Sequence, residues 1–165
     1  IFEPLKLHSA GWGIDGVNDK KIASSYTQDT LLLPSLKIIT YPDGGIYMNS
    51  QDLGKYLMSL MNGYEGEDGL ISASSFKEIM KVQHEEKQGN FKGTRNGLFW
   101  WQSKDGLVGH NGGDTGAIAI MKFNPETKLG ITFTSNIDPT ESDALLIPFE
   151  KILFTLKRYG TLLEN

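Results

Sequence analysis

One segment of the sequence combines residue types that could do chemistry: the glycine-rich run from Gly109 to Gly116, which contains His110, Asn111 and Asp114. Glycines allow a backbone to approach a ligand closely, and successive N–H groups can point at an anion or a developing oxyanion. His110 adds a group that titrates near neutral pH. A tight connection between strands with an incidental histidine has the same composition, so the residues alone leave both interpretations open.

The run lies where one predicted strand ends and the next begins. Two hairpins are expected, and their four antiparallel strands span residues 98–103, 107–110, 117–123 and 129–135. Asp105-Gly106 separates the first two strands, and Asp-Gly between apolar runs is typical of a hairpin. In the third strand both alternating sets of side chains are apolar, which predicts a sheet covered on both faces. Trp100 and Trp101 are interpreted as the core and rim of this sheet.

Helices are the elements expected to cover the sheet, over residues 50–62, 73–83 and 142–159. Asn49 and Ser72 suit the N-caps of the first two helices, and Gly63 and Gly160 suit the ends of the first and third. Loops are expected at 1–33 and 84–93. The predicted fold class is therefore α+β, an antiparallel sheet flanked by helices.

Composition excludes several classes of protein. The 165 residues are 39% hydrophobic and 22% charged, as in ordinary globular domains, which excludes disordered, fibrous and membrane-spanning chains. A net charge of −4 argues against nucleic acid as a partner. The chain has no Cys, and its three His lack metal-ligand spacing, so no metal site is expected. No nucleotide-binding fingerprint is present, and no cofactor is expected.

An ordered series of segments resembles the C-terminal half of serine β-lactamase-like hydrolases. The series is IFEPLKL, YPDGGIYMNSQDLGKYLMSLMNG, LISASSFKEIM, GLFWW and GHNGGDTGAIAIMKFNPETKLGITFTSNID, and it covers the chain from Ile1 to Asp138. The family groups class C β-lactamases, DD-peptidases, D-aminopeptidases and related esterases. Ile1 is not Met, and the opening residues are typical of the middle of a folded segment. We therefore expect residues 1–165 to be a single unit, the C-terminal part of a larger domain.

The resemblance implies a serine acyl-enzyme mechanism built from S-x-x-K, Y-x-N and a K-T-G or H-x-G strand. His110-Asn111-Gly112 matches the third motif in its histidine form, and Gly113 matches the position whose N–H enters the oxyanion hole. His110 is expected to orient the substrate or the tyrosine rather than to act as the primary base. Asn111 and Gly112 are expected to bind substrate.

Two further residues of the resembling segments are candidates for substrate contact, Tyr41 and Asp43. Asp43 stands where relatives usually have a small residue. Asp114 is interpreted as a capping residue or as part of the pocket lining.

Two literal matches to the missing motifs are interpreted structurally. Ser74-Ser75-Phe76-Lys77 satisfies S-x-x-K, but in register with the family it belongs to a peripheral helix. Tyr47-Met48-Asn49 satisfies Y-x-N, but Asn49 is better explained as an N-cap. The nucleophile, its lysine and the tyrosine are therefore expected outside this chain.

The resemblance implies a parent that hydrolyses an ester, amide or peptide bond, and the chain alone is expected to be inactive. The alternative is a non-catalytic ligand-binding or regulatory relative of the same fold. Expected partners are a small-molecule or peptide substrate, the missing N-terminal half, and a second copy joined through an exposed sheet edge. The resemblance weakly favours an exported or envelope-bound protein, although no signal region lies in this chain.

Overall fold

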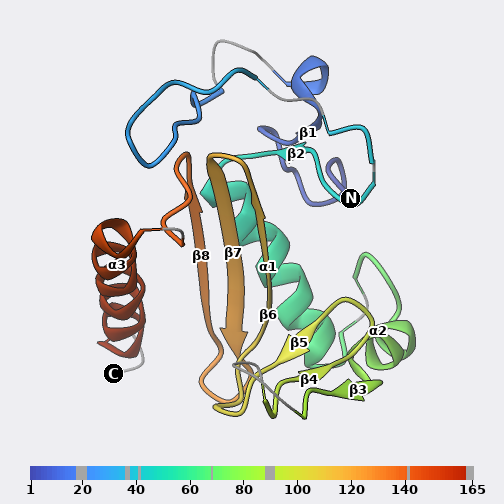
Figure 1. The fold of residues 1–165 in the computed structure, drawn as a ribbon. Coiled ribbons are helices and arrows are strands. Elements are labelled where there is room, and N and C mark those ends of the chain that lie inside the picture. The colour runs from blue at the N-terminus through green and yellow to red at the C-terminus, as the bar shows by residue number, and fades with distance from the viewer. Residues whose placement is uncertain are drawn as a thin grey trace.

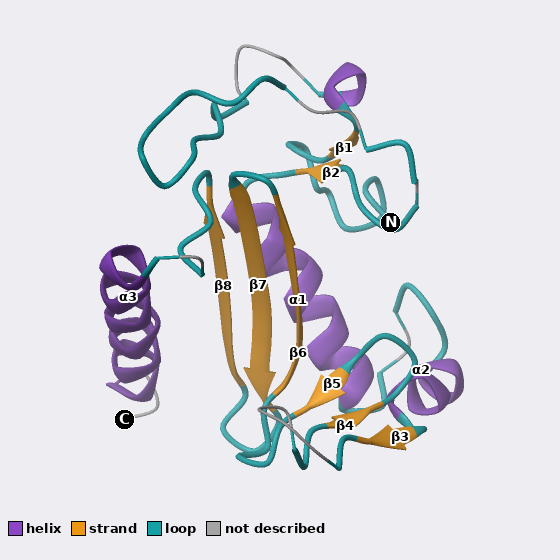
Figure 2. Ribbon diagram, viewed as in Figure 1, coloured by secondary structure: helices purple, strands orange, loops and turns teal. Residues whose placement is uncertain are grey.

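The computed structural model describes residues 1–17, 22–35, 38–40, 42–67, 69–87, 92–140 and 142–162. It is an α+β fold whose main element is a six-stranded antiparallel sheet in the order β3-β4-β5-β6-β7-β8 (Figures 1 and 2). The strands are β3 His84–Glu85, β4 Arg95–Asn96, β5 Trp101–Gln102, β6 Val108–Asp114, β7 Ala117–Asn124 and β8 Leu129–Ser135. All four predicted hairpin strands are present, although the first is only Trp101–Gln102, and the short strands β3 and β4 extend the sheet beyond β5.

Helix α1, Ser50–Tyr64, covers one face of the sheet and forms the main core with it (Figure 1). The core side chains come from α1, from helix α2 (Ala73–Met80), from the sheet and from the residue before β5, and they are Leu57, Leu60, Phe76, Met80, Trp100, Val108 and Phe123. Glycine permits the close approach of α1 to β8, because a Cβ at Gly130 would lie 3.0 Å from Leu57 Cδ2. Burial of this apolar face is what holds α1 against the strands.

Helix α3, Asp143–Leu162, packs against β8 on the opposite face of the sheet. Phe133 of β8 meets Phe149 of α3 with ring centroids 5.2 Å apart. The predicted two-sided cover of the sheet is therefore confirmed. Apolar side chains of α3 that remain exposed are Ile147, Ile152, Phe154, Leu156, Tyr159 and Leu162.

The N-terminal segment lies beyond the end of the sheet at which β6 finishes and β7 begins (Figure 1). It has short elements only, β1 Gly11–Trp12 and a 3-10 turn at Ile14–Gly16, and β1 pairs with β2, Ile46–Tyr47. The Tyr26 N–H donates to the Asn136 carbonyl at 2.9 Å, which ties the segment to the residues after β8. The expected loop with short pieces is thus confirmed.

The helix starts agree with the sequence, and the helix ends do not. Asn49 accepts a hydrogen bond from the Asp52 N–H, and Ser72 accepts one from the Ser75 N–H, so both predicted N-caps are confirmed. Gly63 and Gly160 were predicted to end helices, but each lies inside one. A Cβ would fall 2.8 Å from Phe76 at Gly63 and 2.3 Å from Leu129 at Gly160. These glycines serve close packing rather than termination.

The glycine-rich run was predicted to be the end of one strand and the entry to the next, and most of it is strand. Seven residues of β6 pair in register with β7, from Val108 opposite Phe123 to Asp114 opposite Ala117. Only Thr115 and Gly116 form the turn. Among the described residues, no helix is both long and apolar enough to cross a membrane.

Candidate active site

The second half of β6 has an open edge. Strand β5 pairs only with Val108 and Gly109, because the chain bends at Leu98 and Phe99, just before β5 begins. Phe99 has a φ of 69°, a conformation that costs free energy for a bulky residue, and the residue is 87% exposed. From His110 to Asp114, β7 is therefore the only described strand beside β6.

The residues of this open edge are exposed, and two of them have no side chain. His110, Asn111, Gly112, Gly113 and Asp114 are all exposed to solvent. A Cβ at Gly112 would meet no atom within 4 Å, and one at Gly113 would meet only the Ala117 carbonyl oxygen, at 3.8 Å. A ligand can therefore approach this backbone directly.

Trp100 and Trp101 each contact a side chain at the start of the open edge, His110 and Asn111 respectively. Trp100, only 8% exposed, meets His110 edge-to-face with the ring centroids 6.2 Å apart. Trp101 Nε1 donates a hydrogen bond to Asn111 Oδ1 at 3.2 Å. The predicted core position of Trp100 is confirmed, and Trp101 is half-buried at the sheet edge. Its hydrogen bond was not predicted, since nothing in the sequence relates it to Asn111.

A glycine makes room for the second of these contacts. A Cβ at Gly109 would lie 2.8 Å from Trp101 Cζ2 and 2.6 Å from the Met121 carbonyl oxygen. Strand side chains alternate between faces, so Gly109 and Asn111 lie on the same face of β6, with the Trp101 indole above them. A side chain at position 109 would displace the indole from Asn111.

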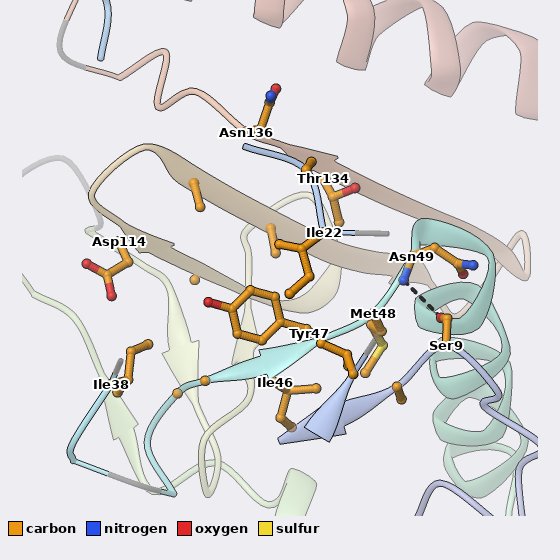
Figure 3. Close-up of a pocket in the computed structure, with 18 of the residues that line it drawn as sticks. Ser9, Ile22, Ile38, Ile46, Tyr47, Met48, Asn49, Asp114, Thr134 and Asn136 are labelled. Atoms are coloured by element: carbon orange, nitrogen blue, oxygen red, sulfur yellow. Dashed lines mark hydrogen bonds between the residues drawn. The ribbon is translucent and has the colours of Figure 1, made fainter. Parts of the chain in front are cut away.

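A cavity of about 1580 Å³ opens between the end of the sheet, β2 and the N-terminal segment (Figure 3). Gly112, Gly113 and Asp114 line it from the sheet, and Ser9 lines it from the N-terminal segment. Tyr47 projects into it from β2. Ligand pockets usually enclose about 300–1000 Å³, so this cavity exceeds the space that one small ligand fills.

The structure brings some of the predicted site residues together at this cavity and leaves others apart. Asp43 lines the cavity, together with Gly112 and Gly113. His110 and Asn111 lie further along the same strand and do not line it. Tyr41 falls outside the described residues.

The two acidic candidates of the cavity each stabilise a turn. Asp43 is exposed, and its carboxylate accepts a hydrogen bond from the Thr40 hydroxyl at 2.7 Å. The Asp114 carboxylate accepts the Thr115 N–H at 2.7 Å, next to Gly116, whose φ is 70°. Asp114 therefore has both of the predicted roles, because it caps the β6–β7 turn and also lines the cavity.

A buried cluster of polar side chains around Asp52 holds one wall of the cavity. The neighbouring N-cap at Asn49 was predicted, but the cluster was not. Asp52 is 3% exposed, and its Oδ2 accepts both the N–H and the hydroxyl of Ser9, each at 2.7 Å. Lys55 Nζ lies 2.6 Å from Asp52 Oδ1 and also donates to the Lys6 carbonyl. The hydrogen bond from Lys55, then those from Ser9, lower the Asp52 pKa from 3.8 to about 2, against the opposing effect of burial.

Ser74, Lys77 and Asn49 of the literal S-x-x-K and Y-x-N matches lie in structural positions, whereas Tyr47 projects into the cavity. Ser74 and Lys77 are exposed on α2, and Ser74 Oγ lies 3.0 Å from the cap hydroxyl of Ser72. Asn49 caps α1 and also donates its N–H to Ser9 Oγ at 3.1 Å, the bond drawn in Figure 3. Within the described ranges no group of three or more His, Asp or Glu could hold a metal ion.

Comparison with protein families finds a match to a family model described as Beta-lactamase, over residues 1–153. No curated protein matches the chain.

Solved structures share the fold at low sequence identity. A penicillin-binding protein homologue from Pyrococcus abyssi, described as octameric, is 23% identical with a TM-score of 0.68 over 82% of this chain. A D-stereospecific amidohydrolase from Streptomyces sp. is 16% identical with a TM-score of 0.62 over 84%. A penicillin binding protein from Bacillus halodurans is 20% identical with a TM-score of 0.66 over 92%. The chain spans 32%, 42% and 46% of the lengths of these three proteins, respectively.

Proposed function

The chain belongs to the beta-lactamase family, and from that premise we propose that it forms part of a serine hydrolase. The hydrolase cleaves an ester, amide or peptide bond through an acyl-enzyme. The chain contributes the H-x-G strand and one N–H of the oxyanion hole. The serine, its lysine and the tyrosine come from another part of the intact protein.

The open edge of β6 is the observation that carries this proposal. His110 to Gly113 are exposed, and the described part of the chain places a strand on one side of them only. An unpaired strand edge offers N–H and C=O groups to an extended ligand. The absence of side chains at Gly112 and Gly113 leaves that backbone accessible.

The size of the cavity supports a site shared with further protein. At about 1580 Å³ it could hold both a substrate and the groups that attack it. Ser74 and Lys77 lie exposed on α2 and Asn49 caps α1, which supports a nucleophile from outside the chain.

In the proposed reaction the serine oxygen bonds to the substrate carbonyl carbon, and the carbonyl oxygen becomes an oxyanion. The Gly113 N–H and the N–H of the nucleophile donate to this oxyanion. The leaving group departs with a proton, and water then attacks the acyl-enzyme and releases the acid. His110 orients the substrate or the tyrosine, and its neighbours Asn111 and Gly112 bind the substrate. Asp43 contributes a further substrate contact from the cavity side, and Tyr41 contributes another.

The test is hydrolysis of p-nitrophenyl acetate by the intact protein, with mass spectrometry to detect an acylated serine. We expect a burst of nitrophenol and a serine carrying one acetyl group. His110→Ala should lower kcat by about 10- to 100-fold, since a positioning group contributes less than the primary base. The chain of residues 1–165 alone should show no turnover.

Two results would contradict the proposal. Turnover by residues 1–165 alone that His110→Ala abolishes would place the whole reaction in this chain. An intact protein that binds ligands but forms no acyl-enzyme would instead be a non-catalytic relative.

A further inference from the structure

The hydrogen bond between Trp101 and Asn111 determines the orientation of the Asn111 amide. An indole N–H is a donor only, so the group it meets must be the amide oxygen. The 3.2 Å contact therefore involves Oδ1, and the NH₂ group lies on the other branch of the amide. Within the described part of the chain, no acceptor contacts that NH₂ group, and the residue is exposed.

The indole itself is held in place by its packing on β6. Trp101 is half-buried, and its ring lies over Gly109, where a Cβ would be 2.8 Å from Cζ2. Backbone pairing of Trp101 with Gly109 fixes the start of the side chain at the same point. Asn111 is two residues further on the same face, within reach of the indole nitrogen.

We propose that Trp101 is a positioning residue, which holds Asn111 as a hydrogen-bond donor toward the substrate and makes the site prefer acyl groups that carry their own carbonyl oxygen. The inference rests on the proposed hydrolase function. The preferred substrates are N-acylamino acyl groups, as in peptides, whereas purely aliphatic acyl groups leave the NH₂ group of Asn111 without a partner. An unmade hydrogen bond at a ligand site lowers affinity, because the donor loses water and gains nothing.

A matched pair of substrates tests this preference in the intact protein. The p-nitrophenyl esters of N-acetylglycine and pentanoic acid have acyl chains of equal length and differ by one amide group. We expect a higher kcat/KM for the N-acetylglycine ester. Asn111→Asp, which replaces the NH₂ by an acceptor, and Trp101→Phe, which removes the indole N–H, should each lower that preference by about fivefold or more. The change should appear in KM, and it should be larger for the N-acetylglycine ester than for the pentanoate ester.

Two control variants make the same chemical changes elsewhere. Asn124→Asp adds the same charge at the far end of the sheet, where Oδ1 already accepts the Glu126 N–H. Trp12→Phe removes an indole N–H from β1. Both should keep the wild-type preference. The double variant of Trp101→Phe with Asn111→Asp should be no worse than Asn111→Asp, because the first residue acts through the second.

If the Trp101 and Asn111 variants lose kcat/KM equally for both esters, the two residues have a structural role only, and the inference is overturned. An unchanged preference between the esters would overturn it as well. If the wild type hydrolyses neither ester, the proposed function has failed, and binding decides the inference separately. Titration with N-acetylglycinamide and pentanamide, followed on the indole N–H resonance that Trp101→Phe removes, should show tighter binding of the first and loss of that difference in Asn111→Asp. Equal binding of the two amides would overturn it.

Discussion

The Asp52 carboxylate joins the N-terminal segment to helix α1 through Ser9, because one oxygen, Oδ2, accepts both the N–H and the hydroxyl of that residue. Lys55 occupies the other oxygen, and the carboxylate is almost fully buried. One side chain in the first turn of α1 therefore holds the segment that forms a wall of the cavity.

Asp52→Asn should destabilise the intact protein by about 2 kcal/mol at neutral pH, because the buried cluster loses its charge and Lys55 loses its partner. The measurement is thermal unfolding. Ser9→Ala removes one of the two donors and should cost less, about 1 kcal/mol. Equal stability of Asp52→Asn and the wild type would mean that the cluster does not hold the segment.

Acid should weaken the same contact. The Asp52 pKa is about 2 in the folded protein and near 3.8 when unfolded, so the ionised carboxylate stabilises the fold above that value. As the pH falls from about 4 to about 2, this contribution is lost. The difference in Tm between wild type and Asp52→Asn should therefore shrink over that range. A difference that stays constant with pH would assign the destabilisation to packing alone.

Gly109→Ala should destabilise the protein by about 2 kcal/mol, since the new Cβ would lie 2.6 Å from the Met121 carbonyl oxygen, a backbone atom that cannot move aside cheaply. The indole resonance of Trp101 should also shift, because the ring is displaced. Unfolding in denaturant and NMR measure the two effects. An Ala at this position with wild-type stability would show that β6 and β7 have room to separate.

Gly112→Ala is the matched substitution on the same strand, with the opposite expectation. No atom lies within 4 Å of the added Cβ, so stability should change by less than about 0.5 kcal/mol. The methyl group would occupy space beside the open edge of β6, and kcat/KM of the intact protein should fall by about tenfold or more. Unchanged kinetics would place the substrate away from Gly112.

Ser74→Ala should leave hydrolysis unchanged, because Ser74 belongs to the exposed start of α2 and not to the nucleophile. Ser72→Ala should cost about 1 kcal/mol of stability through loss of the N-cap, again without effect on the rate. Steady-state kinetics with p-nitrophenyl acetate, alongside thermal unfolding, separates the two effects. Loss of the acyl-enzyme in Ser74→Ala would make this helix the S-x-x-K element after all.

Residues 1–165 expressed alone should self-associate. Helix α3 leaves several apolar side chains exposed, Phe154 at 69% and Ile147 at 54% among them, and β8 pairs only with β7 among the described strands. Exposed apolar surface and an unpaired edge both favour association. Light scattering should give a mass above 18.3 kDa. A monodisperse monomer that binds no hydrophobic dye would contradict this prediction.

The sequence by itself determined the elements that interactions between neighbouring residues stabilise. Side-chain oxygens at Asn49 and Ser72 bond to backbone groups three residues away, so helix starts can be predicted from neighbouring residues. The β7–β8 hairpin follows from two apolar runs separated by turn residues in one continuous stretch. The ordered motifs likewise pointed to the family without any knowledge of the fold.

Tertiary structure decided what each glycine does and what each site side chain faces. In the sequence, Gly63 and Gly160 resemble glycines that end helices. The atoms that require a glycine at these positions belong to Phe76 and Leu129, which lie in other elements. The link from Asp52 to Ser9 spans 43 residues, and the Trp101 hydrogen bond to Asn111 depends on sheet register. Packing decides which distant residues meet, and no local pattern in the sequence specifies that pairing.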